Sequence, residues 1–214
     1  GSTLESGSRT IKRLIQTQVP TVLVDPIHKL PFPSISLDRA GIMALVVEHL
    51  WLRGHRKFAL LGIESDPVLG KVRIEGVKKG LEKFGGDYEA QVCSYTAPGF
   101  GLQDYGYGYS LAKTVLKNGR SETAWIAMND RLVIGALSCL REQAVRVPGD
   151  VALVGFDNLD ISSWYDPPLT TVDQVIPKLF REAVARLVTT ITDFKEDRVS
   201  ETWILPELII RKTS

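Results

Sequence analysis

Acidic and amide side chains follow three apolar stretches of the sequence. PTVLVD ends in Asp25, TAWIAM is followed by Asn129 and Asp130, and VALVGF is followed by Asp157 and Asn158. Carboxylates accept hydrogen bonds, and amides both donate and accept them. Such groups suit a neutral ligand rich in hydroxyl or amino groups, such as a sugar. A ligand without these groups would leave the polar atoms of the site unpaired and would be rejected.

An acid after a strand has a simpler interpretation as the N-cap of the next helix, where its carboxylate accepts backbone N–H groups. Asp130 fits this interpretation because a helical pattern starts at once in RLVIGALSCLREQ. Asp157 fits it poorly because the segment that follows has no convincing helical pattern. We therefore expect Asp130 to cap a helix and Asp157 to bind a ligand.

The elements that must position these residues alternate along the chain. The predicted strands or extended segments are 20–25, 57–63, 90–96, 123–128, 151–156, 167–172 and 202–212. The predicted helices are 9–18, 40–52, 71–85, 109–119, 131–143 and 177–194, and 97–108 is a predicted loop rich in glycine and tyrosine. This alternation predicts an α/β fold with parallel sheets covered on both faces. Ligands of such folds bind beyond the carboxyl ends of the strands, where the acids and amides are expected.

The bulk composition narrows the class of protein. The chain has 214 residues, and its net charge of +1 argues against a stand-alone nucleic-acid-binding protein. No apolar run approaches the roughly 20 residues that span a bilayer, and GSTLESGSRTIKR lacks the apolar region of a signal peptide. Cys93 and Cys139 have no metal or redox spacing, so we expect two small core residues in a reducing compartment. A secreted disulfide is the alternative.

Motifs for catalysis and for phosphate binding are missing from the sequence. There is no GxxxxGK[ST] loop and no GxGxxG after the first predicted strand, which disfavours a dehydrogenase or a sugar kinase. Asp157 and Arg73 could be drawn as a catalytic pair, but no nucleophile and base accompany them. His55 lacks a second histidine or cysteine at metal-ligand spacing, so we interpret it as structural. We predict no enzyme activity, no cofactor and no metal.

Seven stretches carry a resemblance to a known family, in the order in which that family has them. They are VPTVLVD, HLWLRGHRKFALLG, RIEGVKKGL, AMNDRLVIGAL, VPGDVALVGFDN, PPLTTVDQ and PELIIRKTS. Together they cover nearly the whole chain from Val19 and resemble the effector-binding module of the LacI/GalR transcription regulators. The resemblance implies a type I periplasmic-binding-protein-like fold, with two Rossmann-like lobes, three crossing segments and a ligand in the cleft.

The resemblance also implies where the two lobes begin and end. The amino lobe would take 1–36 and 173–204, and the carboxy lobe would take 37–172 and 205–214. The DNA-binding headpiece and the opening elements of the amino lobe have no counterpart in the sequence. We therefore expect an incomplete amino lobe whose sheet has an exposed edge.

The resemblance assigns binding roles to five polar residues. Asp25 would face the cleft from the amino lobe, and Arg73 would grip two neighbouring oxygens of the effector with its guanidinium fork. Asn129 and Asp157 would be polar contacts from the carboxy lobe. Gln174 would follow a crossing segment and touch the ligand. The alternatives are a solvated helix arginine for Arg73 and a hinge residue without ligand contact for Gln174.

Three aromatic residues are candidates for stacking on the apolar face of a sugar. They are Phe100, Tyr105 and Trp164, and the alternative for each is packing in the core or in a loop.

The function implied is that of a cytoplasmic transcription repressor module that binds a small effector, a sugar, and forms a homodimer. Such a module meets operator DNA only through a headpiece outside this chain, and it has no membrane contact. The alternative is a periplasmic sugar-binding protein of a transport system, which has the same fold. The PELIIRKTS ending and the GHRKFALLG run favour the regulator.

Overall fold

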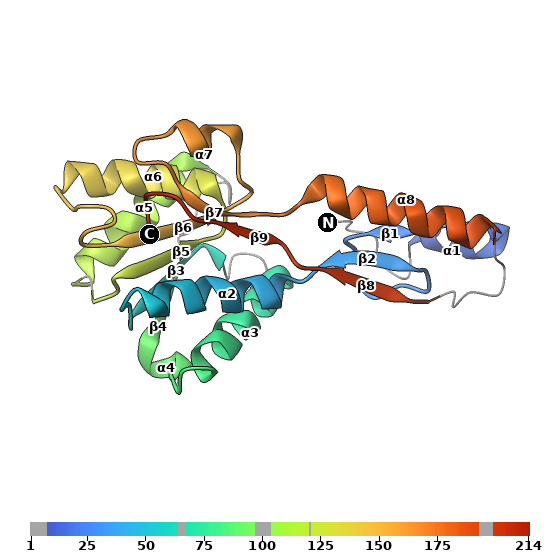
Figure 1. The fold of residues 1–214 in the computed structure, drawn as a ribbon, viewed down its shortest axis with the longest axis horizontal. Coiled ribbons are helices and arrows are strands. Elements are labelled where there is room, and N and C mark those ends of the chain that lie inside the picture. Colours follow the sequence, from blue (N-terminus) through green and yellow to red (C-terminus); the bar gives the residue numbers. More distant parts are fainter. Residues whose placement is uncertain (1–7, 64–66, 97–103, 120, 193–198) are drawn as a thin grey trace. The chain divides into compact units, whose positions relative to one another are not determined.

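The computed structural model describes residues 8–63, 67–96, 104–119, 121–192 and 199–214. The chain divides into two compact units (Figure 1). The smaller unit is Gly1–Asp38 with Val175–Pro206, and the larger unit is Arg39–Gln174 with Glu207–Ser214. No helix within the described ranges has both the length and the apolar character needed to cross a membrane.

The larger unit is built on a six-stranded sheet in the order β4-β3-β5-β6-β7-β9. The first five strands are parallel, and β9 runs antiparallel to β7 at the edge. The strands are β3 (Phe58–Leu61), β4 (Val92–Tyr95), β5 (Ala124–Ala127), β6 (Ala152–Phe156), β7 (Thr170–Asp173) and β9 (Glu207–Ile209). The predicted α/β fold with parallel sheets is confirmed.

Helices cover both faces of this sheet (Figure 1). Phe58 and Leu60 of β3 face a helix pair made of α2 (Arg39–Leu52) and α3 (Leu69–Glu82). Ala59 and Leu61 face the opposite pair, α5 (Tyr105–Lys117) and α6 (Asp130–Glu142). Because successive residues of a strand point to opposite faces, burial on both faces requires the continuous apolar runs seen in the sequence. Two short helices, α4 (Tyr88–Gln91) and α7 (Asp160–Trp164), complete the unit.

The smaller unit is a three-stranded parallel sheet in the order β1-β2-β8. Its elements are α1 (Arg9–Thr17), β1 (Leu23–Val24), β2 (Ser34–Leu37), α8 (Ile176–Thr192) and β8 (Glu201–Ile204). Ile35 and Leu37 of β2 pack with Leu179 of α8, whereas Ile11 of α1 packs with Leu23. The core of this unit therefore consists of two apolar clusters, one formed with α8 and the other with α1.

The predicted elements missed one strand and began one helix too late. Strand β2 was not predicted, because two of its four residues are serines. All four residues are nevertheless buried. Helix α5 begins at Tyr105, inside the predicted loop, because Asp104 caps it and Tyr107 is fully buried. The segment 202–212 contains extended chain as predicted, in two strands, β8 and β9, which belong to different units.

The prediction that both cysteines lie in the core was wrong for one of them. Cys139 is buried on α6, but Cys93 is exposed on β4. The thiols are free, and β4 is one of the two edge strands of the sheet. Because an edge strand has no neighbouring strand on one side, Cys93 on β4 is open to solvent.

Helices α5 and α6 approach so closely that glycine is required at their contact. A Cβ added at Gly135 would overlap the backbone carbonyl oxygen of Tyr105, and one added at Gly108 would overlap that of Leu132. Backbone atoms cannot move aside as the end of a flexible side chain can. The two glycines therefore set the separation of the helices.

We expect Gly135→Ala to destabilise the fold even though alanine is the better helix former. Overpacking of this kind costs about 2 kcal/mol or more, which exceeds the gain of roughly 1 kcal/mol in helix propensity. The free energy of unfolding in urea, followed by circular dichroism, measures the cost. Ser138→Ala, at an exposed position of the same helix, is the control and should change stability by less than about 0.5 kcal/mol. Equal stabilities of the two variants would contradict the close contact.

His49 links α2 to the start of strand β7. Its Nε2 lies 2.8 Å from the hydroxyl of Ser214, which donates to the hydroxyl of Thr170 on β7. Burial, followed by the charges of Arg53 and His55, lowers the pKa of His49 to about 4. The folded imidazole is therefore neutral in a range where the unfolded chain already binds a proton.

Stability should consequently fall as the pH is lowered from 6.5 toward 4. Below pH 6.5 the unfolded imidazole gains a proton that the folded one refuses, and each unit of pKa difference is worth 1.36 kcal/mol. We expect wild type to lose about 2 kcal/mol more than His49→Gln between pH 7 and pH 5. Urea unfolding of both proteins at the two pH values measures this difference. Parallel pH dependences would show that His49 ionises normally in the folded state.

Candidate functional site

Four of the predicted site residues lie at one edge of the six-stranded sheet. Asn129 follows the end of β5, Asp157 follows β6, and Gln174 follows β7. These strands are neighbours and parallel, so their carboxyl ends meet at the same edge. Arg73 reaches this edge from α3. The topology thus brings together polar residues that are up to 101 positions apart in the sequence, from 73 to 174.

Arg73 is held by the ends of two strands. Its side chain is buried, and Nη1 donates to the carbonyl oxygen of Met128 at 3.1 Å, just beyond β5. Its guanidinium carbon lies 4.5 Å from the centre of the Phe156 ring at the end of β6. An arginine stacked on an aromatic face with a backbone acceptor is fixed in place. The alternative of a solvated helix arginine is therefore wrong.

Asn129, and not Asp130, is the N-cap of α6. Its side-chain oxygen accepts a hydrogen bond from the backbone N–H of Leu132 at 3.0 Å, and the residue is buried. The expectation that Asp130 caps the helix was wrong. A pattern that places two capping residue types side by side cannot decide between them, because the choice depends on which backbone conformation the tertiary fold imposes.

The carboxylate of Asp130 is fully buried beneath this edge and ties three segments together. It accepts hydrogen bonds from the hydroxyl of Thr171 on β7 at 2.5 Å, from the hydroxyl of Ser162 at 2.6 Å and from the backbone N–H of Leu159 at 3.0 Å. Burial raises the pKa of Asp130, and these hydrogen bonds oppose the rise. A Cβ at Gly155 would overlap Oδ1, so only glycine lets the carboxylate come this close to β6. Residue types alone did not identify this role.

Asp157 presents its carboxylate at the end of β6 from an unusual backbone conformation. Its φ is 104° and that of Asn158 is 47°, two consecutive positive values outside glycine. The side chain is exposed, and it accepts a hydrogen bond from the amide of Gln174. Helix α7 starts only at Asp160. Asp157 therefore does not begin a helix, in agreement with the sequence pattern.

The remaining three candidates lie elsewhere or beyond the described residues. Asp25 belongs to the smaller unit, where it follows β1 with a φ of 49° and accepts a hydrogen bond from the backbone N–H of Leu37 at 3.2 Å. Trp164 ends α7 with 85% of its surface exposed, so packing in the core is wrong for this residue. Phe100 lies outside the described residues.

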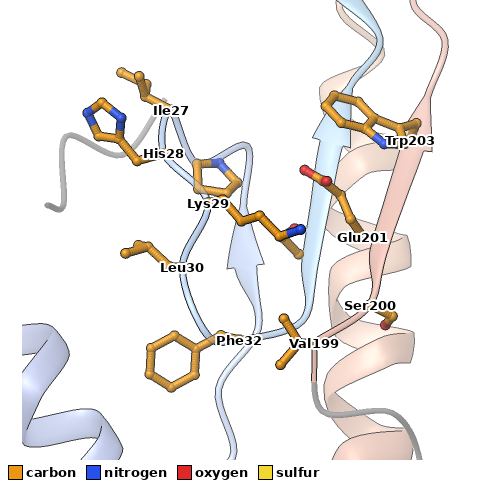
Figure 2. Close-up of a pocket in the computed structure, with 11 residues that line it drawn as sticks. Ile27, His28, Lys29, Leu30, Phe32, Val199, Ser200, Glu201 and Trp203 are labelled. Carbon is orange, nitrogen blue, oxygen red and sulfur yellow. The ribbon is translucent and has the colours of Figure 1, made fainter. Parts of the chain in front are cut away.

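A small hollow of about 100 Å³ occurs in the smaller unit (Figure 2). The segment after β1 and the start of β8 enclose it, and Lys29, Phe32, Glu201 and Trp203 are among its lining residues. None of the predicted site residues lines it. All of its lining residues belong to the smaller unit.

Within the described ranges, no three His, Cys, Asp or Glu side chains gather as they would around a metal ion. Nδ1 of His55 lies 2.9 Å from the hydroxyl of Thr123, which joins the turn after α2 to the start of β5. Burial, with the neighbouring charges of Arg53 and Arg56, lowers the pKa of His55. These contacts describe a structural histidine.

The two-layered helix cover, the parallel order of the strands and the polar carboxyl edge define a class of ligand-binding domain. Residues 47–214 match the family described as a periplasmic binding protein-like domain, and the chain belongs to this family. Within it, the chain is a module of the LacI-family type.

Three similar proteins illustrate this placement. The chain is 34% identical over 175 residues to the HTH-type transcriptional repressor PurR of Haemophilus influenzae, across 79% of this chain and 49% of that protein. A LacI-family transcriptional regulator from Sanguibacter keddieii has a TM-score of 0.72 and 30% identity, over 91% of this chain and 71% of that one. The regulator CelR in complex with cellobiose has a TM-score of 0.77 and 25% identity, over 99% of this chain and 64% of that one. The chain spans about half the length of the curated relatives it matches.

We expect Asp130→Ala to destabilise the larger unit strongly. The substitution leaves two buried hydroxyls and one backbone N–H without their acceptor, at a cost of about 3–5 kcal/mol in the free energy of unfolding. Urea unfolding measures this loss, and Glu82→Ala at an exposed position of α3 is the control, with a change below about 0.5 kcal/mol. A loss under about 1 kcal/mol for Asp130→Ala would mean that water replaces the carboxylate.

Proposed function

We propose that this chain is the effector-binding module of a LacI-family transcription regulator. The smaller unit takes the role of the amino lobe, and the larger unit takes that of the carboxy lobe. The observation that carries the proposal is the gathering of Arg73, Asn129 and Asp157 at the carboxyl edge of a sheet with this family's fold.

Each residue at the edge supplies a different part of the recognition. The guanidinium of Arg73 offers a positive, hydrogen-bond-donating group between the ends of β5 and β6. Asp157 offers an exposed acceptor, and Asn129 adds an amide that can donate as well as accept. Gln174, which already contacts Asp157, is placed to share the same ligand. For Asp25, Trp164 and Phe100, ligand contact stays a prediction.

A sugar is the effector that suits this set of groups. Neighbouring hydroxyls of a sugar both donate and accept, so they can pair with a carboxylate, an amide and a guanidinium at once. The regulator CelR, with the same fold, is in complex with cellobiose. The arrangement has polar groups for binding but no nucleophile with an adjacent base, which supports a module that binds its effector without turnover.

The whole protein is proposed to be a homodimeric repressor in the cytoplasm. Its contact with operator DNA is assigned to a headpiece outside this chain, and no membrane contact is invoked. Differential affinity of the effector for two states of the module would shift the protein between them. A transport protein is the weaker candidate, because the similar proteins of at least 25% identity given above are transcription regulators.

Substitutions at the edge test the effector site. We expect Asp157→Asn and Arg73→Lys, each made in the full-length protein, to weaken sugar binding about tenfold or more, because a hydrogen bond to a charged group contributes about 1.5–3 kcal/mol. Lysine replaces Arg73 because alanine would leave a void beside the Phe156 ring. A thermal-shift screen with mono- and disaccharides, including cellobiose, selects the sugar, and titration calorimetry measures the affinities.

Two matched substitutions away from the edge are the controls. Asp160→Asn changes an exposed acid three positions from Asp157, and Arg141→Lys changes an arginine that donates to the carbonyl of Asp166. Both should keep wild-type affinity. Unchanged affinity in Asp157→Asn and Arg73→Lys as well would refute the site assignment.

A further inference from the structure

Three polar residues from separate parts of the chain form a connected group behind the polar edge. Arg211, which follows β9, donates from one terminal nitrogen to the side-chain oxygen of Asn158 at 2.8 Å. The amide nitrogen of Asn158 donates to the carboxylate of Asp173 at 2.9 Å. The other terminal nitrogen of Arg211 donates to the carbonyl oxygen of Leu169 at 2.8 Å.

This group adjoins two of the residues proposed to bind the effector. Asn158 directly follows Asp157, and Asp173 directly precedes Gln174. Asp157 and Gln174 also contact each other, so the group holds both ends of that contact. A rigid backing for groups that touch a ligand preserves their geometry and lowers the cost of ordering them on binding.

The backbone at Asp157 and Asn158 needs such support. Both residues have positive φ, a region in which non-glycine residues are strained by of order 1–3 kcal/mol each. Backbone hydrogen bonds restrain part of this turn, because the N–H of Asp157 bonds the carbonyl of Val172. The N–H of Asn158 has a longer bond of 3.4 Å to the hydroxyl of Thr171. The side chain of Asn158 is therefore the firmer attachment at that position.

The chemistry of the group allows only one orientation of the Asn158 amide. Arg211 is purely a donor, so it must face the amide oxygen, and the carboxylate of Asp173 is an acceptor, so it must face the amide nitrogen. A lysine at 211 has a single nitrogen and cannot reproduce the fork that spans Leu169 and Asn158. The arginine is also anchored through its backbone N–H, which donates to the hydroxyl of Thr170.

We propose that Arg211, Asn158 and Asp173 are positioning residues that hold Asp157 and Gln174 in their binding geometry. They act on the effector through those two residues and not by touching it. This inference rests on the proposed function for its consequence, which is a dependence of sugar affinity on Arg211. We call these three residues the clamp. Its effect on the backbone is a property of the chain that can be measured without any ligand.

Nuclear magnetic resonance of the 214-residue chain tests the clamp directly. In wild type, the backbone amides of Asn158 and Gln174 should have order parameters near 0.85, and in Arg211→Lys these should fall below about 0.6. Arg141→Lys is the matched control, since Arg141 also donates to a backbone carbonyl of the larger unit, and it should leave both values unchanged. Asp173→Asn, which keeps the shape of the side chain, provides a second variant if Arg211→Lys fails to fold.

Calorimetry with cellobiose, or with whichever sugar the screen selects, gives the second readout in the full-length protein. We expect Arg211→Lys to lower the affinity about tenfold, with an unfolding midpoint close to that of Arg141→Lys. Order parameters of Asn158 and Gln174 that stay at wild-type values in the folded variants would overturn the clamp. If no sugar binds wild type, the proposed function fails, but the order parameters still decide the clamp.

Discussion

The buried carboxylate of Asp130 holds together the segments that carry the polar edge. It accepts from the loop after β6, from α7 and from β7, and the missing side chain of Gly155 makes room for it. A buried acceptor of this kind must be fully paired, because each unpaired partner costs about 1–3 kcal/mol. The positions of Asp157 and Gln174 depend on that pairing, since they stand on the segments that it joins.

Parallel strand order explains why the edge can be built from distant residues. Strands β5, β6 and β7 end at the same side of the sheet, so the residue after each strand joins a common row. The reversed strand β9 adds something that a purely parallel sheet could not. It starts opposite Asp173 and runs toward the start of β7, so that Arg211 lies beside Leu169 and Thr170. From there the side chain of Arg211 reaches Asn158 and places a cation where the turn needs support.

Close packing beneath the edge keeps these relationships rigid. The glycine contact between α5 and α6 fixes one helix layer, and His49 ties α2 to the start of β7 through Ser214 and Thr170. Arg73 is part of the same rigid body, because its guanidinium lies against Phe156 and bonds the backbone beyond β5. A ligand at the edge would therefore meet groups whose positions are already set, which reduces the entropy lost on binding.

Local patterns in the sequence were enough to predict the layers and the row of polar residues. Continuous apolar runs marked strands buried on both faces, and the acids and amides after them marked the carboxyl edge where Asn129 and Asp157 lie. These features depend on hydrophobic periodicity and on the order of the elements, both of which can be read from short windows of the sequence. Gln174 was predicted only from the family resemblance. Strand β2 escaped prediction because two of its four residues are serines, which are buried only by neighbours far away in the chain.

Only the tertiary structure decided which polar residue does what. Asn129 caps α6 while the adjacent Asp130 is buried, Arg73 is stacked instead of solvated, and Arg211 supports a turn that lies 53 positions earlier. Each of these roles depends on a partner brought close by strand pairing or helix packing. The sequence determines the residue types that are available, but hydrogen-bond partners and burial exist only once distant segments have come together.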